Sequence, residues 1–300
     1  MDIHRLEVFC KVVELQSFTR AGEEIYLSQS TVSEHIRSLE TILEEKLVDR
    51  LNRKVLPTPV GRILYGYAKE ILRMRLNAIQ AITAFRGRVA GLIPLGASTI
   101  PGTYYLPEYI GTFREQHPDI RVNLNIASSR TIADEVLAGE CEAGMIGAKW
   151  NDYSLDWQEI FMDELILCVH SGHPWRHREE IDIKELAKEP FILRERGSGT
   201  RKVMMDFLAD HGFKIDKLQV AAEMNSTETI RRSIKAGIGI SILSRQAVLE
   251  DLANGSLSVV PIKGIQFYRP FYLITAKKRE LSPGCSLFLD HLRITPAMYP

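Results

Sequence analysis

Residues 17–61 read SFTRAGEEIYLSQSTVSEHIRSLETILEEKLVDRLNRKVLPTPVG, a pattern that predicts two short helices across a tight turn, a hairpin and the start of a longer helix. Ser28 is a good residue to cap the second helix, and apolar residues recur after it at helical spacing. These residues are Val32, Ile36, Leu39 and Leu43. Because a helix held with its N-terminus outward is a common means of entering the DNA major groove, this stretch favours a DNA-binding head.

The expected helix at 29–43 presents polar side chains opposite its apolar stripe. Hydroxyl, amide and guanidinium groups suit base edges and phosphates. The candidate DNA-binding residues on this helix and its cap are Ser28, Gln29, Ser30, Thr31, Ser33, Glu34 and Arg37. A hairpin wing expected at 50–55 adds the cations Arg50, Arg53 and Lys54, which would hold phosphates beside the helix. Since a polar face is also typical of an ordinary solvated helix, these cations are what favour DNA binding.

Five short motifs extend the pattern around this helix-turn-helix. They are Leu6-x-x-Phe9, Ser17-Phe18-Thr19-x-Ala21, Leu27-Ser28-Gln29-x-x-Val32-Ser33, Ile36-x-x-Leu39-Glu40 and Thr58-Pro59-x-Gly61. Together they resemble the LysR-type transcriptional regulators, and the resemblance extends over essentially the whole chain. The chain departs from that family at Gly22, where a second alanine is usual, at Ser30, where proline or alanine is common, and at Val48, where phenylalanine is frequent. None of these departures removes an expected DNA contact.

The resemblance implies an α/β fold class overall, with a mostly α-helical winged helix-turn-helix at the N-terminus. It also implies a two-subdomain effector-binding domain like that of periplasmic solute-binding proteins. The expected parts are the DNA-binding domain (1–58), a dimerising linker helix (59–90) and the effector domain (91–300), divided into a first subdomain (91–161 with 267–300) and a second (162–266).

The linker helix also has its own signal in the sequence. Thr58 is a good N-cap, and Pro59 fits the first helical position. Apolar residues then follow at alternating spacings of four and three, which is the seam of a dimeric coiled coil. The predicted seam comprises Val60, Leu64, Tyr67, Ile71, Met74, Ala78, Ala81 and Phe85. The alternative is a single amphipathic helix packed on its own domain, although such helices usually bury a wider stripe.

Gly87, Gly91 and Pro94 mark a hinge, beyond which strands and helices alternate. Strands are expected at 92–97, 121–126, 143–146, 165–169, 191–193, 219–222 and 239–241. Helices are expected around 106–116 and at 132–137. This alternation predicts an α/β domain with a largely parallel sheet.

Ligands of α/β domains bind where strands end and helices begin. Four such junctions are rich in hydroxyl residues, and each offers backbone N–H groups at the positive end of a helix, which suits an anion. We therefore expect a small anionic effector, a carboxylate or an inorganic oxyanion, with charge supplied by Arg194 and Arg201. One junction alone is typical of an ordinary helix cap, so the prediction depends on their recurrence. The predicted effector site comprises Ser98, Thr99, Ile100, Ser128, Ser129, Gly147, Arg194, Gly197, Ser198, Thr200, Arg201, Ser226 and Thr227.

The composition of the 300-residue chain, 45% hydrophobic and 25% charged, is that of an ordinary globular protein. No apolar run approaches the ~20 residues of a membrane span, and the N-terminus lacks the apolar block of a signal peptide. We expect a cytoplasmic protein. Residues 1–58 hold eight basic against ten acidic residues, whereas residues 59–90 hold six against one. The placement of charge, rather than its sum, must therefore decide DNA binding.

No cofactor or metal is expected. Cys10, Cys141, Cys168 and Cys285 are scattered without a CxxC motif, which is typical of reduced thiols in a cytoplasmic protein. His170, His173 and His177 have no carboxylate or thiol that completes a convincing zinc site. The stretch 197–200 reads GSGT and resembles a phosphate loop, but it lacks the following lysine.

The leading hypothesis is a ligand-responsive transcription regulator that is not an enzyme. Dimers, or dimers of dimers, would read a pseudo-palindromic double-stranded operator through the helix at 29–43 and the wing at 50–55, and the effector would change their geometry. The alternatives are a cytoplasmic small-molecule-binding protein and a cleft enzyme without DNA function. No paired carboxylates or serine–histidine arrangement supports the enzyme. Within the family, residues 96–102 and 194–201 resemble branches tied to sulfur, selenium or carbon assimilation, and the selenium-metabolism-associated, cysteine-regulon-like branch is the nearest.

Overall fold

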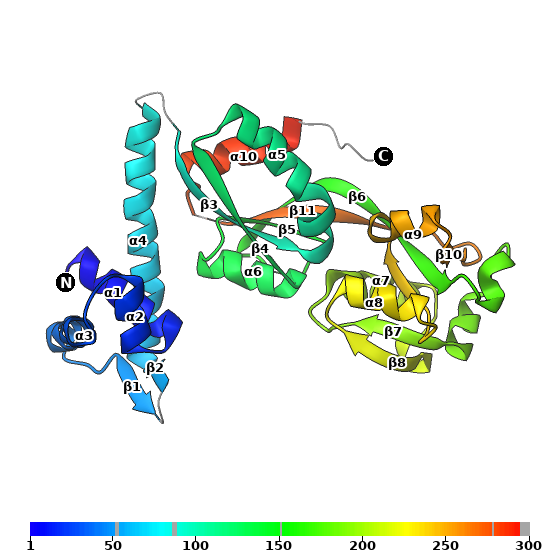
Figure 1. Cartoon of the computed structure of the whole chain (residues 1–300), viewed down its shortest axis with the longest axis horizontal. Helices are drawn as coiled ribbons and strands as arrows, with labels where there is room; N and C mark the ends of the chain where they lie inside the picture. The colour runs from blue at the N-terminus through cyan, green and yellow to red at the C-terminus, as the bar shows by residue number, and fades with distance from the viewer. Residues whose placement is uncertain (52–53, 86–88, 151, 278, 295–300) are drawn as a thin grey trace. The chain divides into compact units, whose positions relative to one another are not determined.

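The computed structural model describes residues 1–51, 54–85, 89–150, 152–277 and 279–294 (Figure 1). The predicted wing residue Arg53 and the predicted hinge residue Gly87 lie outside this range, as do the side chains of Arg50, Ala81 and Phe85. No helix of the described residues is long and apolar enough to cross a membrane.

The chain divides into two compact units, and the first, Met1–Arg88, contains the helix-turn-helix. Its elements are α1 (Ile3–Leu15), α2 (Phe18–Glu24), α3 (Gln29–Leu43), β1 (Val48–Leu51), β2 (Lys54–Pro57) and α4 (Pro59–Phe85). The side chains of Asp2, Ser17 and Ser28 cap α1, α2 and α3, each accepting a hydrogen bond from the backbone N–H three residues later. The helix starts are therefore fixed by local sequence, as the position of Ser28 predicts.

The core of the first unit is the apolar stripe of α3 packed against α1, α2 and the start of α4. Its most buried members include Phe9, Ala21, Val32, Leu39 and Ala68, all fully enclosed. Leu43, the last residue of the predicted stripe, is half-buried against the same core. The face of α3 opposite this stripe is left outside the core.

Helix α4 uses one face for this core and leaves a second apolar face in solvent. The first two residues of the predicted dimer seam, Val60 and Leu64, are partly buried against the head's own core. Later seam residues are exposed, with Tyr67 at 65% and Met74 at 68% of their maximal area. Ile63, just outside the predicted seam, is 63% exposed on the same helix.

The second unit, Val89–Pro300, alternates strands and helices. Its strands are β3 (Gly91–Ser98), β4 (Ile120–Ala127), β5 (Ala143–Ile146), β6 (Leu155–His170), β7 (Pro190–Arg194), β8 (Gln219–Met224), β9 (Ser241–Ser244), β10 (Leu257–Val259) and β11 (Phe267–Ala276). Its α-helices are α5 (Leu106–Gln116), α6 (Ser129–Ala138), α7 (Gly199–Asp210), α8 (Thr227–Lys235), α9 (Leu249–Ala253) and α10 (Pro283–Ile294). A π-helical turn, Pro101–Tyr105, leads into α5.

The large sheet of this unit is mixed, so the prediction of a largely parallel sheet is wrong. Its strand order is β10-β6-β11-β5-β3-β4, with β9 also paired to β6. β3 pairs in parallel with β4 and β5, and β7 pairs in parallel with β8 in a separate sheet. β11 runs antiparallel to both β5 and β6, and β6 runs antiparallel to β9 and β10. The long β6 and β11 account for the difference, because they lie side by side in opposite directions (Figure 1).

β6 and β11 contribute to two separate groups of hydrophobic cores and so join two lobes. Phe161 and Phe271 belong to a core that also contains residues of β3 and that α5 and α10 cover. Leu165 and Phe267 belong to the core that contains β7 and α7. In the first lobe α6 covers the opposite face of the sheet through Ile132 and its neighbours (Figure 1).

The strand expected at 239–241 begins later, since β9 spans Ser241–Ser244. The preceding Gly239 lies against β7, where an added Cβ would come within 2.4 Å of the Pro190 carbonyl oxygen. Ile240 forms an isolated bridge with Phe191. Glycine at position 239 therefore allows the backbone to pass close to β7, and it lies before the strand rather than in it.

The start of α4 gives a testable difference between two glycines of one helix. Thr58 caps α4 by accepting the Gly61 N–H at 2.9 Å, and its hydroxyl donates to the Lys46 carbonyl at 2.6 Å. This closeness leaves no room at Gly61, where a Cβ would lie 2.0 Å from the Leu47 carbonyl oxygen, whereas a Cβ at Gly66 meets nothing within 4 Å.

We expect Gly61→Ala to lower the free energy of unfolding by about 1–3 kcal/mol, because the helix start must shift to relieve the overlap. Gly66→Ala should instead stabilise by up to about 1 kcal/mol through helix propensity. Urea unfolding followed by circular dichroism measures both. Equal effects of the two variants would contradict the tight junction between Thr58 and Leu47.

Candidate functional site

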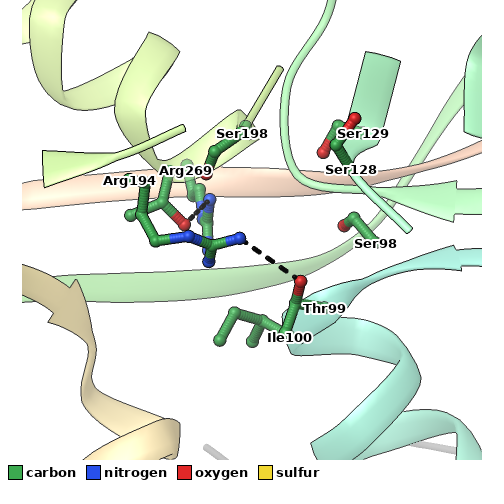
Figure 2. Close-up of a pocket in the computed structure, with 10 residues that line it drawn as sticks. Ser98, Thr99, Ile100, Ser128, Ser129, Arg194, Ser198 and Arg269 are labelled. Carbon is green, nitrogen blue, oxygen red and sulfur yellow. Dashed lines mark hydrogen bonds between the residues drawn. The ribbon is translucent and has the colours of Figure 1, made fainter. Parts of the chain in front are cut away.

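The four hydroxyl-rich junctions of the second unit meet in one place. An inner pocket is lined by residues that follow β3, β4 and β7, together with one residue of β11 (Figure 2). These residues are Ser98, Thr99, Ile100, Ser128, Ser129, Arg194, Ser198, Gly199, Thr200 and Arg269. An outer pocket shares Thr99 and Ser128 and adds the fourth junction through Asn225 and Ser226.

Three α-helices direct their N-termini to these pockets. Ser128, Ser198 and Ser226 cap α6, α7 and α8, and their side chains accept the backbone N–H groups of Thr131, Arg201 and Thr229 at 3.1, 3.4 and 3.3 Å. The positive ends of the helix dipoles therefore face the same small volume, an arrangement that favours negative charge.

The two lobes touch across the inner pocket. The Arg130 N–H donates to the Gly197 carbonyl at 3.4 Å, and a Cβ at Gly197 would lie 2.8 Å from the Ser128 hydroxyl. A Cβ at Gly199 would lie 2.6 Å from the Ser129 hydroxyl. The inner pocket leaves about 10 Å³ for the centre of a water-sized sphere, and the outer pocket leaves about 670 Å³. The inner pocket therefore has room for about one water molecule, whereas the outer pocket has room for a larger ligand.

Arg194 extends into the inner pocket from the end of β7 with only 4% of its side chain exposed. Its Nε and Nη2 atoms each lie 3.0 Å from an oxygen of the Glu195 carboxylate. Nη1 donates to the Thr227 hydroxyl at 2.7 Å, and Nη2 donates to the Asn225 carbonyl at 3.2 Å. Nη2 also donates to the Thr99 hydroxyl at 3.5 Å (Figure 2). Glu195 thus neutralises the positive charge of Arg194, which the sequence led us to expect an effector to neutralise.

Arg269 is a second buried arginine that lines the inner pocket. It does not belong to the predicted effector site. Its Nε and Nη2 lie 2.9 and 2.7 Å from Asp163 Oδ2, and both side chains are 2% exposed. Ser244 donates to the other oxygen of Asp163 at 2.6 Å. Arg269 Nη1 donates to the Thr200 hydroxyl at 3.0 Å, which lies at the start of α7. The ion pair between β6 and β11 thereby holds the start of α7, which forms one wall of the pocket.

Ten of the thirteen predicted effector residues line one or both pockets. Thr227 lies behind Arg194 as its acceptor, and Gly147 lies behind Arg269, whose Nη1 is 3.5 Å from its carbonyl oxygen. Arg201 lines neither pocket. It donates to the Arg194 carbonyl at 2.8 Å and pairs with Glu223 at 2.7 Å, so its charge is directed elsewhere.

The four cysteines and His173 are buried. Burial raises the pKa of the Cys10, Cys141 and Cys168 thiols to about 12, and it also raises the pKa of Cys285. These thiols are therefore protonated and unreactive at neutral pH. His173 accepts the Trp175 N–H through Nδ1 at 3.1 Å, and burial lowers its pKa. The described residues contain no group of three metal-ligand side chains.

In the first unit, the polar face of α3 is open to solvent. Gln29, Ser30, Glu34 and Arg37 are exposed, and Thr31 and Ser33 are partly buried. Ser28 Oγ lies 2.7 Å from the Ser30 hydroxyl and 2.8 Å from the Thr31 hydroxyl, which orders the first turn. Of the wing cations, Lys54 is described and exposed.

Tyr26 is a further candidate at this face that sequence reasoning missed. It sits in the turn before α3 with 96% of its surface exposed. Its backbone has φ of 58°, a left-handed conformation that is uncommon for a bulky residue. The ring therefore contributes little to the core of the head.

Comparison with known proteins identifies both units. Residues 3–62 match the model of the bacterial regulatory helix-turn-helix proteins of the lysR family, and residues 86–295 match the LysR substrate binding domain. The chain is 29% identical to the HTH-type transcriptional activator CmpR of Synechocystis sp. over 97% of this chain and 94% of CmpR.

Two solved structures are similar in fold. A full-length OxyR variant of Pseudomonas aeruginosa superposes with a TM-score of 0.74 at 21% identity, covering 99% of this chain and 96% of that one. The regulatory domain of Synechocystis CcmR, solved in complex with 2-PG, superposes with a TM-score of 0.64 at 27% identity. That match covers 69% of this chain and 99% of the CcmR domain.

The Asp163–Arg269 pair gives a prediction about stability. We expect Asp163→Asn to lower the free energy of unfolding by about 3–5 kcal/mol, because it leaves a buried guanidinium without its counter-charge. The double variant Asp163→Leu with Arg269→Met should lose less, since it removes both charges. Thermal and urea unfolding of the full chain measure both. A single variant as stable as the parent would contradict the structural role of the pair.

Proposed function

This chain belongs to the LysR family of bacterial helix-turn-helix transcriptional regulators, and from that premise we propose how its two units divide the work. Members of the family are DNA-binding regulators with an effector-binding domain rather than enzymes. The first unit reads an operator through the exposed face of α3, and the second unit binds a small effector between its lobes. We further propose that the protein acts in the cytoplasm, where its operator lies.

The observation that carries the effector site is the convergence of four strand-to-helix junctions on one cleft. Three of the junctions are ordinary helix caps, and the fourth leads from β3 into a π-helical turn. Together they line the cleft with helix N-termini and hydroxyl groups. Such a site suits a small oxyanion. The similar CcmR domain was solved with 2-PG, which makes 2-PG a reasonable first probe for this cleft.

The proposed DNA contacts divide into two kinds. Gln29, Ser30, Ser33 and Glu34 lie where base edges would be read, whereas Arg37 and the wing cations suit phosphates. The acidic total of the head does not oppose this, because Glu44 and Glu45 follow the far end of α3. Base contacts should therefore set specificity, and the cations should set salt dependence.

Dimerisation is proposed along the solvent-exposed apolar face of α4. Tyr67, Ile71 and Met74 keep much of their area exposed although they are large and apolar. Such a continuous stripe on a long helix is what a second copy of the chain covers. Two copies would present two α3 helices to the half-sites of a pseudo-palindromic operator.

We expect Gln29→Ala to weaken binding to the operator by about 1–3 kcal/mol, because it removes one base contact. The thermal stabilisation produced by an effector such as 2-PG should remain unchanged. Mobility-shift titration and thermal denaturation of the same preparation measure the two properties. Glu45→Ala, an exposed change just beyond α3, is the matched control. A loss of both properties in Gln29→Ala would contradict the division of labour.

We expect Met74→Glu to convert the dimer to monomers at micromolar concentration while circular dichroism stays that of the folded chain, because a charge is then placed in the apolar contact. Arg75→Glu, also exposed and adjacent on α4, should leave the dimer intact. Sedimentation velocity distinguishes the two species. A dimer that persists in Met74→Glu would place the interface elsewhere.

A further inference from the structure

The charge of Arg194 is matched by an acid from within the chain. The guanidinium is almost fully enclosed, and two of its nitrogens face the two oxygens of the neighbouring Glu195 at 3.0 Å each. Its other acceptors, the Thr227 and Thr99 hydroxyls and the Asn225 carbonyl, are uncharged. A buried guanidinium requires a counter-charge, and among the described hydrogen-bond partners of Arg194 Glu195 alone supplies one.

The two members of this pair line different pockets of the cleft. Arg194 lines the inner pocket, and Glu195 lines the larger outer pocket. About a quarter of the Glu195 side chain is exposed, compared with 4% for Arg194. The carboxylate therefore approaches the guanidinium from the solvent side, which is also the side from which a dissolved anion would arrive.

The Glu195 side chain can leave without moving the backbone that carries it. Its N–H donates to the Met224 carbonyl at 3.1 Å, and its carbonyl accepts the Ser198 N–H at 3.0 Å. These bonds hold the main chain at the start of α7 independently of the carboxylate. A rotation of the side chain into the outer pocket would expose the guanidinium to that pocket.

We propose that the Glu195 carboxylate occupies the position of the effector's anionic group and that the effector binds by displacing it from Arg194. The inference rests on the proposed effector cleft and deepens it. It names the ligand chemistry: an oxyanion with two oxygens spaced to bridge Nε and Nη2, which carboxylate, sulfate and phosphate share. A chloride ion, which presents a single centre, does not replace the two bonds that Glu195 makes.

This internal competition makes Glu195 a determinant of affinity. Every effector must exchange one charge-assisted pair for another, so its binding is weaker than that of the same anion at an unpaired arginine. Removing the carboxylate should therefore tighten anion binding, which is opposite to the usual result of changing a residue that lines a site. That sign separates competition from a merely structural role.

The test uses the full chain and sulfate, phosphate and 2-PG as separate probes, with ionic strength held constant by sodium chloride. In Glu195→Gln we expect at least one of these oxyanions to bind about tenfold more tightly than in the parent protein, measured by thermal shift and calorimetry. Glu195→Asp keeps the charge but shortens its reach, so it should lie between the two. This second variant retains a counter-charge and keeps the test valid if Glu195→Gln folds poorly.

The matched control is Glu185→Gln. It breaks another two-point arginine–glutamate pair in the same unit, in which Arg178 Nη1 and Nη2 lie 2.7 and 3.0 Å from the carboxylate of Glu185. That pair lines neither pocket, so the control should bind the oxyanions as the parent does.

Three outcomes would overturn the proposal. Equal oxyanion affinity in the parent and Glu195→Gln would show that Glu195 does not compete, while leaving the effector cleft in place. Weaker binding in both Glu195 variants would make the carboxylate a direct contact of the ligand. The absence of binding of all three oxyanions in every variant would reject both the competition and an anionic effector, whereas operator binding would still stand on its own assay.

Discussion

The pairing of β6 with β11 is the constraint on which the effector unit depends. These two strands carry side chains into the cores of both lobes, so their register fixes how the lobes face each other across the cleft. The buried Asp163–Arg269 pair lies within this ladder, and Arg269 reaches from it to Thr200 at the start of α7. Arg269 therefore ties the paired strands to the wall of the cleft.

The cleft combines a field that attracts anions with arginines that are already paired. Helix N-termini and hydroxyl groups favour a negative ligand, yet Arg194 and Arg269 are each matched by a carboxylate. The two arginines differ in access, because Asp163 is enclosed whereas Glu195 is partly exposed. The structure therefore assigns Arg269 to holding the lobes and leaves Arg194 as the guanidinium that a ligand can reach. The response to an effector then comes from Arg194 exchanging Glu195 for the ligand at the small inner pocket.

Much of the architecture follows from local signals that the sequence carries openly. Ser28 and Thr58 are caps that fix the starts of α3 and α4, and the stripe from Val32 to Leu39 packs as its spacing predicts. The strands expected at 92–97 and 143–146 lie within β3 and β5. The antiparallel strands of the large sheet could not be predicted from local sequence, because strand direction depends on partners far apart in the chain. Phe267 of β11, for example, pairs with Leu165 of β6.

The lining of the pockets was predictable to the extent that it is built from strand ends and helix caps, such as Ser98 at the end of β3 and the caps Ser128 and Ser198. Arg269 was missed because it belongs to a strand rather than to a junction, although a lone cation in the apolar run of β11 was a signal. The role given to Arg201 depended on its position beside the GSGT turn, but the direction of its side chain is decided by Glu223 on β8. Side-chain direction of this kind depends on tertiary contacts, which spacing alone does not reveal.

We propose that an operator-reading head and an anion-responsive cleft act together in one regulator. This is tested most directly by a mobility-shift titration of the protein on the DNA that precedes its own gene, with and without 2-PG, sulfate or phosphate, across a range of salt. We expect a saturable complex that outcompetes bulk DNA, weakens with salt, and changes its mobility or affinity when the oxyanion binds. A complex that bulk DNA displaces equally well, and that none of these oxyanions alters, would contradict it.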